Sequence, residues 1–231
     1  MPEEQHPQNP VFIQRMFGQI AHRYDLANHI LSMGLDYGWR RKIGRILAGT
    51  GATNILDLAT GSGDLAKTLA HHCPHAKIIA ADFCLPMLAQ AQKKSVPNLV
   101  AGDGMKLPFA SGTFDALTIA FGLRNMSSYP DALKEFIRVL KPQGQLLILD
   151  FSFPENFIKI PYRIYLRHVL PHIAKILTGE KCAYDYLGAS IEAFPSGQKM
   201  IELLKATGAH SAVAKPLAGG IVTLYQAEKV N

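Results

Sequence analysis

The sequence of 231 residues has few cysteines and no long apolar run. Its three cysteines, Cys73, Cys84 and Cys182, are an odd number without CxxC spacing, which argues against a disulfide scaffold or a zinc site. No apolar stretch reaches the roughly eighteen residues of a membrane span. The polar beginning, MPEEQHPQNP, has no apolar signal-peptide core. We therefore expect a cytoplasmic protein with free thiols and no resident metal.

Charged residues are also sparse, at 18% against 48% hydrophobic residues, which is a globular composition rather than a disordered one. The net charge of +6 is compatible with nucleic acid, an anionic membrane surface or an acidic substrate. The basic residues are scattered apart from Arg40-Arg41-Lys42, which we interpret as a solvated helix face. Because no aromatic residues are interleaved with them as a stacking platform, we expect no nucleic-acid partner.

The pattern along the chain predicts one elaborated domain. Residues 1–10 are polar and proline-containing, which indicates a loose tail before a single domain over 11–231. Short helices over 11–50 form an N-terminal cap, and strands alternate with helices from Asn54 onward. A helical stretch over 153–195 interrupts that alternation before the last strands. The predicted fold class is α/β: a doubly wound, Rossmann-like, mostly parallel sheet with a helical cap and a helical insertion.

Polar or glycine residues follow four of the predicted strands, at the edge where open α/β sheets bind ligands. They are Asp57 with Gly61, Ser62 and Gly63 after the first strand, Asp82 after the second, Asp103 after the third, and Gly122–Asn125 after the fourth. An aspartate at such a point is more often a turn or cap residue, but four polar ends together favour a ligand site. Asp82 follows the glycine loop at the spacing typical of a ribose-binding carboxylate, and Asp103 can accept from an adenine amino group.

The glycine loop itself allows two nucleotide ligands. Gly61-Ser62-Gly63-Asp64-Leu65-Ala66 satisfies G-x-G-x-x-G/A, the pattern of dinucleotide binding. A dinucleotide places its pyrophosphate at the helix N-terminus, where Asp64 would repel it. S-adenosylmethionine carries an adenosine without phosphate and a positive sulfonium, so the charge of Asp64 favours it over NAD. An NAD-dependent oxidoreductase remains the alternative from this spacing.

Several longer motifs together resemble one enzyme family. LDLATGSGDL, AADFCLPML, AGDGMKLPFASGTFDALTIAFGLRN and RVLKPQGQLLILDFSFP are similar to class I S-adenosylmethionine-dependent methyltransferases. More narrowly, MFGQIAHRYDLANHILSMGLDYGWR, TIAFGLRN, YDYLGASIEAFP and GGIVTLY resemble the C-methyltransferases of menaquinone and ubiquinone biosynthesis. The resemblance extends from about Met16 to Tyr225. It implies methylation of demethylmenaquinol to menaquinol, with a ubiquinone-pathway benzoquinol as the alternative substrate; EAFP around Phe194 favours the menaquinone side.

The resemblance assigns S-adenosylmethionine contacts to Ser62, Asp82, Asp103, Gly104 and Ala120. At Ala120, where some relatives have serine, only the backbone is available for such a contact. The sequence departs from the family at Cys84, where serine is common, and this puts a helix-capping hydroxyl in doubt. It also departs at the end, where GGIVTLYQAEK replaces a GGIVALHRG-like run.

Arg124 and Asn125, at the end of the fourth strand, are the candidate catalytic residues, with Tyr24 and His22 as candidates on the cap side. Methylation of a ring carbon requires a positioned phenol-type ring and stabilisation of negative charge on its oxygen. Arginine suits that stabilisation because it stays protonated, and asparagine can orient a hydroxyl or a water. The alternative is that Arg124 and Asn125 cap the next helix or pair with Asp25.

The segment Pro161–Gly179 is the candidate contact for a polyprenylated quinol. Apolar and aromatic residues recur on one helical face, basic residues lie on another, and Pro171 predicts a kink. An ordinary amphipathic helix over the sheet explains this pattern, as does a basic helix that walls the quinol pocket and brings it to an anionic membrane. We therefore allow for peripheral membrane contact, and also for a homo-oligomer.

Overall fold

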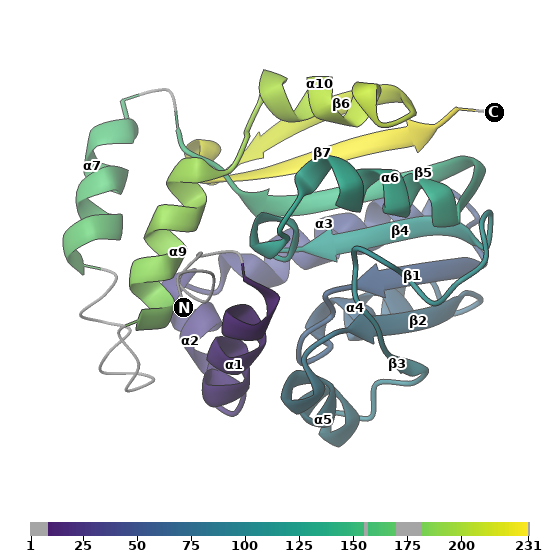
Figure 1. Cartoon of the computed structure of the whole chain (residues 1–231), viewed down its shortest axis with the longest axis horizontal. Coiled ribbons are helices and arrows are strands. Elements are labelled where there is room, and N and C mark those ends of the chain that lie inside the picture. Colours follow the sequence, from purple (N-terminus) through teal and green to yellow (C-terminus); the bar gives the residue numbers. More distant parts are fainter. Residues whose placement is uncertain (1–8, 155–156, 170–181, 231) are drawn as a thin grey trace.

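The computed structural model describes residues 9–154, 157–169 and 182–230, with helices packed on both faces of one seven-stranded sheet (Figure 1). The strands are β1 Asn54–Leu58, β2 Lys77–Asp82, β3 Leu99–Ala101, β4 Phe114–Ala120, β5 Leu140–Phe151, β6 Ala209–Leu217 and β7 Val222–Lys229. Their order in the sheet is β3-β2-β1-β4-β5-β7-β6. β1 to β5 are parallel, and β7 lies antiparallel between β5 and β6. The predicted doubly wound, mostly parallel sheet is confirmed.

The helices divide into those that cover the sheet and those that cap its edge. Helical elements are α1 Pro10–Ile20, α2 Tyr24–Leu31, α3 Leu35–Ala48, α4 Asp64–His72, α5 Leu85–Lys93, η2 Leu123–Asn125, α6 Tyr129–Val139, α7 Lys159–Ile164, η3 Tyr165–Val169, α9 Cys182–Ala193, α10 Gln198–Ala206 and η4 Ala218–Gly220. Buried residues of α6 and α10 share one core with the sheet, and those of α3 and α4, together with Ala91 of α5, share another. Each strand can serve both cores because successive side chains point to opposite faces.

A third core joins the N-terminal helices to the helical insertion. Ile13 and Met16 of α1 pack with Tyr162 of α7, Leu166 of η3 and Tyr186 of α9. In Figure 1, α1, α2, α7 and α9 accordingly lie together at one end of the sheet. Two segments far apart in the sequence therefore form one helical cover over the carboxyl ends of the parallel strands.

The first helix has an identifiable start. Pro10 occupies the first turn, where its missing N–H costs no helical hydrogen bond, and the side chain of Asn9 accepts from the backbone N–H of Val11 at 2.9 Å. Helical structure therefore begins at Pro10, inside the segment 1–10 predicted as a tail.

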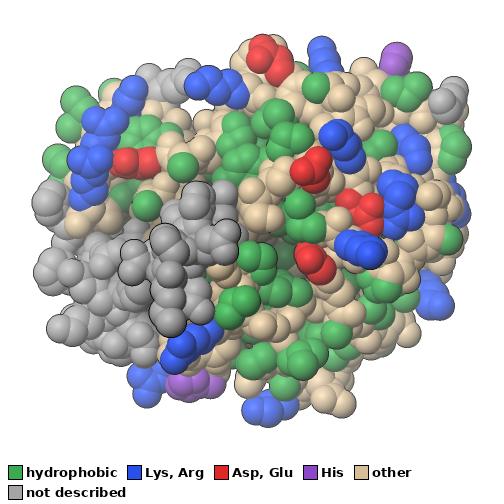
Figure 2. Space-filling view, in the orientation of Figure 1, with side chains coloured by type: hydrophobic (Ala, Val, Ile, Leu, Met, Phe, Trp, Pro, Cys, Tyr) green, Lys and Arg blue, Asp and Glu red, His purple; other side chains and the backbone are tan. Residues whose placement is uncertain are grey.

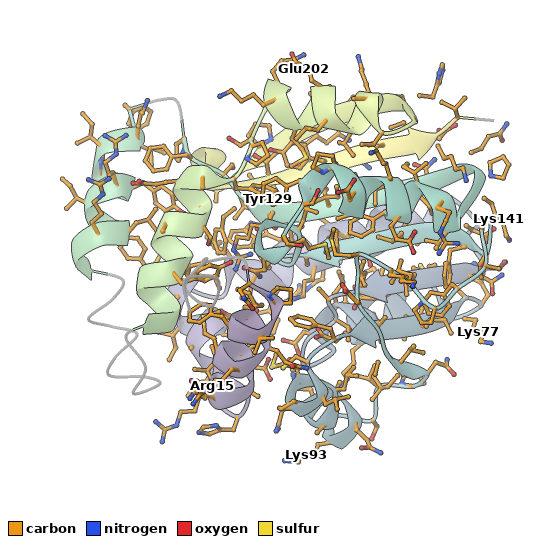
Figure 3. All side chains as sticks on the ribbon, viewed as in Figure 1. Arg15, Lys77, Lys93, Tyr129, Lys141 and Glu202 are labelled. Atoms are coloured by element: carbon orange, nitrogen blue, oxygen red, sulfur yellow. The ribbon has the colours of Figure 1, made fainter. Side chains whose placement is uncertain are left out.

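Basic side chains are dispersed over the face of the molecule that Figures 2 and 3 show. Figure 3 shows Arg15, Lys77, Lys93 and Lys141 on four different elements, and Figure 2 shows lysine and arginine in separate places on that face. The interpretation of Arg40-Arg41-Lys42 as a solvated face is correct for the two exposed residues, Arg41 and Lys42, and wrong for Arg40. The Arg40 side chain is buried because it forms an ion pair with Asp36 one helical turn earlier.

Candidate active site

Two cavities lie at the carboxyl edge of the parallel strands and adjoin each other. The smaller, about 90 Å³, is lined by residues that follow β1, β2, β3 and β4. The larger, about 480 Å³, lies under the helical cover and is predominantly apolar. Phe17, Tyr24 and Phe121 line both cavities. The two cavities therefore share part of their walls.

The two predicted glycines of the loop have different roles. Gly61, at φ 58°, lines the smaller cavity, and its backbone N–H donates to Asp82 Oδ2 at 2.8 Å. Gly63, at φ 86°, is not among the residues that line either cavity. A Cβ there would lie 2.4 Å from Val96 Cγ2, so Gly63 is required for packing against the segment after α5.

Asp82 is buried at the end of β2, with its carboxylate at the wall of the smaller cavity. Besides the Gly61 amide it accepts from the backbone N–H of Cys84 at 2.8 Å. Burial raises the pKa of Asp82, and these backbone hydrogen bonds oppose the rise. Cys84 occupies the N-cap position of α5 without a side-chain cap bond, so the doubt about a capping hydroxyl at this position is confirmed.

Three further predicted residues line the same cavity: Asp103, Gly104 and Ala120. Asp103 is exposed, and its Oδ1 accepts from the backbone N–H of Met105 at 2.9 Å. Gly104 is buried, and a Cβ on it would lie 2.6 Å from the terminal carbon of Met126. The structure thus brings the ends of β2, β3 and β4 together around one space, with small residues where the backbone borders it.

Ser62 faces the cap rather than either cavity. Its hydroxyl donates to Asp25 on α2, and it lies 3.1 Å from Lys94 Nζ. Lys94 also forms ion pairs with Asp25 at 2.6 Å and with Asp64 at 2.5 Å. The negative charge of Asp64 is therefore compensated, which weakens the prediction that it repels phosphate at this helix start.

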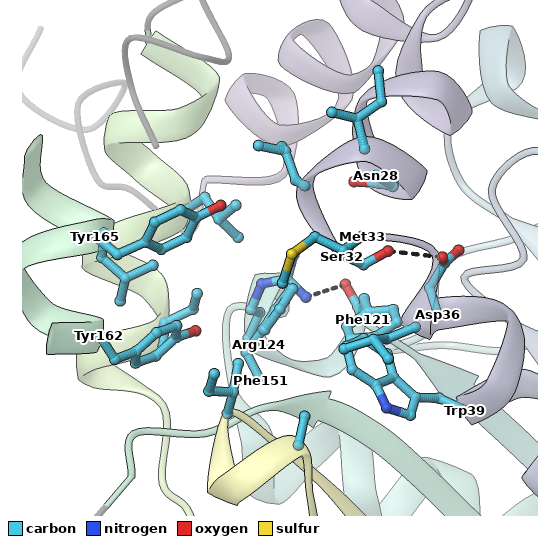
Figure 4. A pocket seen from close by; sticks show the side chains of 18 of the residues that line it. Asn28, Ser32, Met33, Asp36, Trp39, Phe121, Arg124, Phe151, Tyr162 and Tyr165 are labelled. Carbon is cyan, nitrogen blue, oxygen red and sulfur yellow. Dashed lines mark hydrogen bonds between the residues drawn. The ribbon is translucent and has the colours of Figure 1, made fainter. Parts of the chain in front are cut away.

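Arg124 forms a buried ion pair with Asp150, which sequence reasoning missed. Its Nη1 lies 2.8 Å from Asp150 Oδ1. The same nitrogen donates to the Phe121 carbonyl oxygen at 2.5 Å (Figure 4). The guanidinium also lies 5.2 Å from the centre of the Phe151 ring, and Arg124 lines the larger cavity. Burial raises the pKa of Asp150, and the charge of Arg124 opposes that rise. The sequence did contain a signal for Asp150, because this aspartate ends the apolar run LLILD. The same kind of signal led to the selection of Asp57 and Asp82.

Neither Arg124 nor Asn125 caps the next helix, so that alternative is wrong. Both lie in η2, and Ser128 caps α6 by accepting from the backbone N–H of Asp131 at 3.4 Å. Asn125 lines the smaller cavity, and its Oδ1 accepts from the hydroxyl of Tyr186 at 3.1 Å. Since Tyr186 lines the larger cavity, this hydrogen bond connects the walls of the two spaces.

The tyrosines around the larger cavity remain neutral hydrogen-bonding groups at ordinary pH. Burial raises the pKa of Tyr24 above its usual value of 10 and that of Tyr186 to about 12. Tyr24 lies where the two cavities meet, because it lines both of them. His22 is exposed and is not among the residues lining either cavity, so the structure gives it no place at this site.

A polar group at one end of the larger cavity was missed from the sequence. It comprises Asn28, Ser32, Asp36 and Arg40, from α2, α3 and the turn between them. The Ser32 hydroxyl donates to Asp36 Oδ1 at 2.7 Å, and His29 Nδ1 lies 2.7 Å from Asp36 Oδ2 (Figure 4 shows the Ser32 contact). Burial would raise the pKa of Asp36, but the Ser32 hydrogen bond and the Arg40 charge outweigh it and lower the pKa. Asp36 is therefore an ionised acceptor.

The segment Pro161–Gly179 is described only as far as residue 169. Tyr162, Tyr165 and Leu166 line the larger cavity, whereas Arg163 and Arg167 are exposed. In its described part the segment therefore has the predicted apolar and basic faces. The kink predicted at Pro171 lies outside the described residues.

The chain resembles one protein family over most of its length. The sequence model of the ubiE/COQ5 methyltransferase family matches residues 3–229. The chain is 43% identical to the demethylmenaquinone methyltransferase of Thermus thermophilus, over 84% of this chain and 90% of that protein. It is 44% identical to the ubiquinone/menaquinone biosynthesis C-methyltransferase UbiE of Syntrophotalea carbinolica, over 91% of each.

Solved structures support the fold independently. An S-adenosylmethionine-dependent methyltransferase from Thermotoga maritima, described as a possible histamine N-methyltransferase, superimposes with a TM-score of 0.65 over 93% of this chain and 98% of that one. The two sequences are 16% identical, so this likeness concerns the fold alone.

Proposed function

The chain belongs to the ubiE/COQ5 methyltransferase family, and we propose that it transfers the methyl group of S-adenosylmethionine to a ring carbon of demethylmenaquinol. The observation that carries this proposal is the pair of adjoining cavities that share Phe17, Tyr24 and Phe121. One cavity has the donors and acceptors for an adenosine, and the other is apolar enough for a naphthalene-type ring. Over most of its length this chain is 37–43% identical to proteins from several bacteria that are named demethylmenaquinone methyltransferases. This similarity supports demethylmenaquinol, rather than the ubiquinone precursor, as the substrate of this chain.

The smaller cavity suits S-adenosylmethionine because of the groups around it. Asp82 offers a carboxylate to ribose hydroxyls, and Asp103 offers one to the adenine amino group. Gly61 and Gly104 allow the backbone to approach the ligand. Bound there, the cofactor supplies an electrophilic methyl group on a positively charged sulfur. Ser62 has no side-chain contact with this cavity, so we assign it to fixing the loop against Asp25.

The larger cavity suits the quinol ring. Its aromatic and aliphatic walls exclude water from the ring, and Arg124 places a permanent cation at one side of it. A ring hydroxyl that loses its proton makes the ring carbons more nucleophilic, and a fixed cation stabilises the resulting oxyanion. Asp150 and the Phe121 carbonyl hold the guanidinium in place, so Arg124 is preorganised before substrate binds.

Exposed apolar residues border this cavity and suggest how a polyprenylated substrate reaches it. Met33, Ile30 and Leu35 line the cavity and are 84%, 44% and 46% exposed. Exposed Arg163 and Arg167 belong to the segment whose Tyr162, Tyr165 and Leu166 line the same cavity. Aliphatic side chains with arginines nearby favour an anionic lipid surface. We therefore propose peripheral membrane contact at this rim. Among the described residues no helix is long and apolar enough to cross a bilayer.

Methyl transfer tests the proposed function directly. Purified protein is incubated anaerobically with labelled S-adenosylmethionine and a short-chain demethylnaphthoquinol, with benzoquinol analogues and NADH in parallel. Product methylated at a ring carbon, with one S-adenosylhomocysteine formed per methyl group, supports the proposal. Transfer to oxygen alone, or no transfer to either ring, contradicts it.

A further inference from the structure

We propose that Ser32 and Asp36 select the reduced form of the ring, a hydroquinol, over the oxidised quinone. This inference rests on the proposed function, because it concerns the ring that the larger cavity holds. The two redox forms have nearly the same shape but opposite hydrogen-bonding character at oxygen. A quinol presents O–H groups that can donate, whereas a quinone presents carbonyl oxygens that can only accept. A residue whose hydrogen-bonding polarity is fixed can therefore distinguish them.

The polarity of Ser32 is fixed by its protein partners. A serine hydroxyl has one hydrogen, and here two acceptors compete for it: Asp36 Oδ1 at 2.7 Å and the backbone carbonyl of His29 at 3.3 Å. Asp36 is buried and ionised, so it cannot donate to Ser32 in return. The Ser32 oxygen consequently offers only lone pairs to the cavity that it lines.

Asp36 is itself held in this state from its other side. Its Oδ2 accepts from Arg40 on the same helix and lies 2.7 Å from His29 Nδ1. His29 also stacks on the Tyr37 ring, and its Nε2 lies 3.7 Å from Asp64 Oδ2, while Arg40 Nη2 lies 3.9 Å from the same oxygen. These contacts hold the carboxylate ionised and in position, so Ser32 cannot rotate its hydrogen into the cavity without leaving a buried charge with one acceptor site unfilled.

The two polar regions of the cavity thereby differ in hydrogen-bonding character, as do the two oxygens of a quinol that loses one of its protons. Arg124 supplies donors, which suit the ring oxygen that develops negative charge. Ser32 supplies an acceptor, which suits a ring oxygen that keeps its hydrogen. A quinone carbonyl at Ser32 would face lone pairs and the nearby carboxylate, and it would lose a hydrogen bond. Because the electron-poor quinone cannot be methylated by an electrophile, rejecting it keeps the site free for the productive form.

Binding of a redox pair tests the inference without turnover. Trp39, the single tryptophan, lines the larger cavity, so quenching of its fluorescence reports occupancy. The probes are 1,4-naphthoquinol and 1,4-naphthoquinone, measured anaerobically in the presence of S-adenosylhomocysteine. We expect wild-type protein to bind the quinol more tightly than the quinone. Ser32→Ala should reduce the ratio of the two affinities about five- to tenfold, chiefly by weakening quinol binding.

A second variant and a control separate selection from a structural role. In Asp36→Asn the side-chain amide can donate to the Ser32 oxygen, so that the Ser32 hydroxyl hydrogen can point into the cavity. The ratio of quinol affinity to quinone affinity should therefore fall further than in Ser32→Ala. Ser211→Ala, at an exposed position of β6, should leave the ratio unchanged. Equal weakening of both probes by Ser32→Ala, or no change in either, overturns the inference. Failure of wild-type protein to methylate a quinol, with the binding ratio intact, instead refutes the proposed function and leaves the selection of redox state standing.

Discussion

Arg124 and Asp150 form an ion pair, with Nη1 and Oδ1 2.8 Å apart, at the ends of adjacent parallel strands. Asp150 is fully buried, and the Arg124 side chain is 5% exposed. Removing one member of such a pair leaves a buried charge uncompensated and typically costs about 3–5 kcal/mol. The pair therefore has a structural role whatever Arg124 does in catalysis, and a test of the proposed catalytic role must preserve the charge.

Arg124→Lys preserves the charge but loses the planar array of donors. We expect kcat to fall at least tenfold, because one ammonium cannot bind Asp150, the Phe121 carbonyl and a developing oxyanion in the same geometry. Affinity for S-adenosylhomocysteine should change little, since Arg124 does not line the smaller cavity. Steady-state kinetics and isothermal titration measure both quantities. Arg41→Lys, an exposed position on α3, is the control; a preserved kcat in Arg124→Lys would show that the guanidinium is structural.

Asp82→Ala should weaken binding of S-adenosylmethionine about ten- to a hundredfold. The substitution removes a carboxylate from the cofactor cavity and also removes the acceptor of the Gly61 and Cys84 amides. Loss of charge-assisted hydrogen bonds of roughly 1.5–3 kcal/mol gives this range. Isothermal titration measures the affinity, with Glu202→Ala on α10 as an exposed control (Figure 3). Unchanged affinity in a folded Asp82→Ala protein would refute the assignment of the smaller cavity.

Asp57 should make stability fall as pH rises through the acid range. Burial raises its pKa from 3.8 to about 6, despite hydrogen bonds from Thr60 and Thr118. The folded state therefore holds the Asp57 proton more tightly than the unfolded state does, and between about pH 4 and pH 6 ionisation of this group costs stability, up to about 3 kcal/mol.

Asp57→Asn removes that titration while keeping the shape of the side chain. Urea unfolding of both proteins at several pH values gives the difference in free energy of unfolding, in which the other carboxylates cancel. We expect the variant to gain stability relative to wild type between pH 4 and pH 6 and the difference to level off above about pH 7. A difference that does not depend on pH would show that Asp57 titrates near its ordinary value.

Met33→Asn tests the rim of the larger cavity as a membrane contact. Met33 has a left-handed backbone at φ 52°, which asparagine tolerates better than most residues, so the variant should fold normally. Relative to wild type, we expect a smaller fraction of the variant to sediment with anionic vesicles. With neutral vesicles we expect the decrease in the sedimented fraction to be smaller. Val213→Asn, an exposed apolar position on β6, is the control. Equal sedimentation of wild type and Met33→Asn would exclude this rim as the contact.

The sequence predicted the sheet well because its parallel strands are short apolar runs that end at polar or glycine residues. The alternation of strands and helices does begin at Asn54, and the polar residues after β1 to β4 do converge on one edge. That convergence follows from topology, since the carboxyl ends of parallel strands share an edge.

Contacts that depend on how the helical cover docks could not be predicted in the same way. The Ser62 hydroxyl faces Asp25 because α2 packs over the glycine loop, and Lys94, the C-cap residue of α5, compensates Asp64. Ser32 and Asp36 carry no motif, and their importance becomes apparent only from the cavity that they line. Local pattern specifies which strand ends are polar, whereas tertiary packing decides which partner each side chain meets.

The transfer of a labelled methyl group from S-adenosylmethionine to a short-chain demethylnaphthoquinol tests the central claim most directly. We predict a ring-methylated quinol, identified by mass spectrometry and NMR, with an equal amount of S-adenosylhomocysteine and loss of most activity in Arg124→Lys. Absence of ring methylation by folded protein that binds S-adenosylhomocysteine, or methylation at oxygen only, would contradict the account.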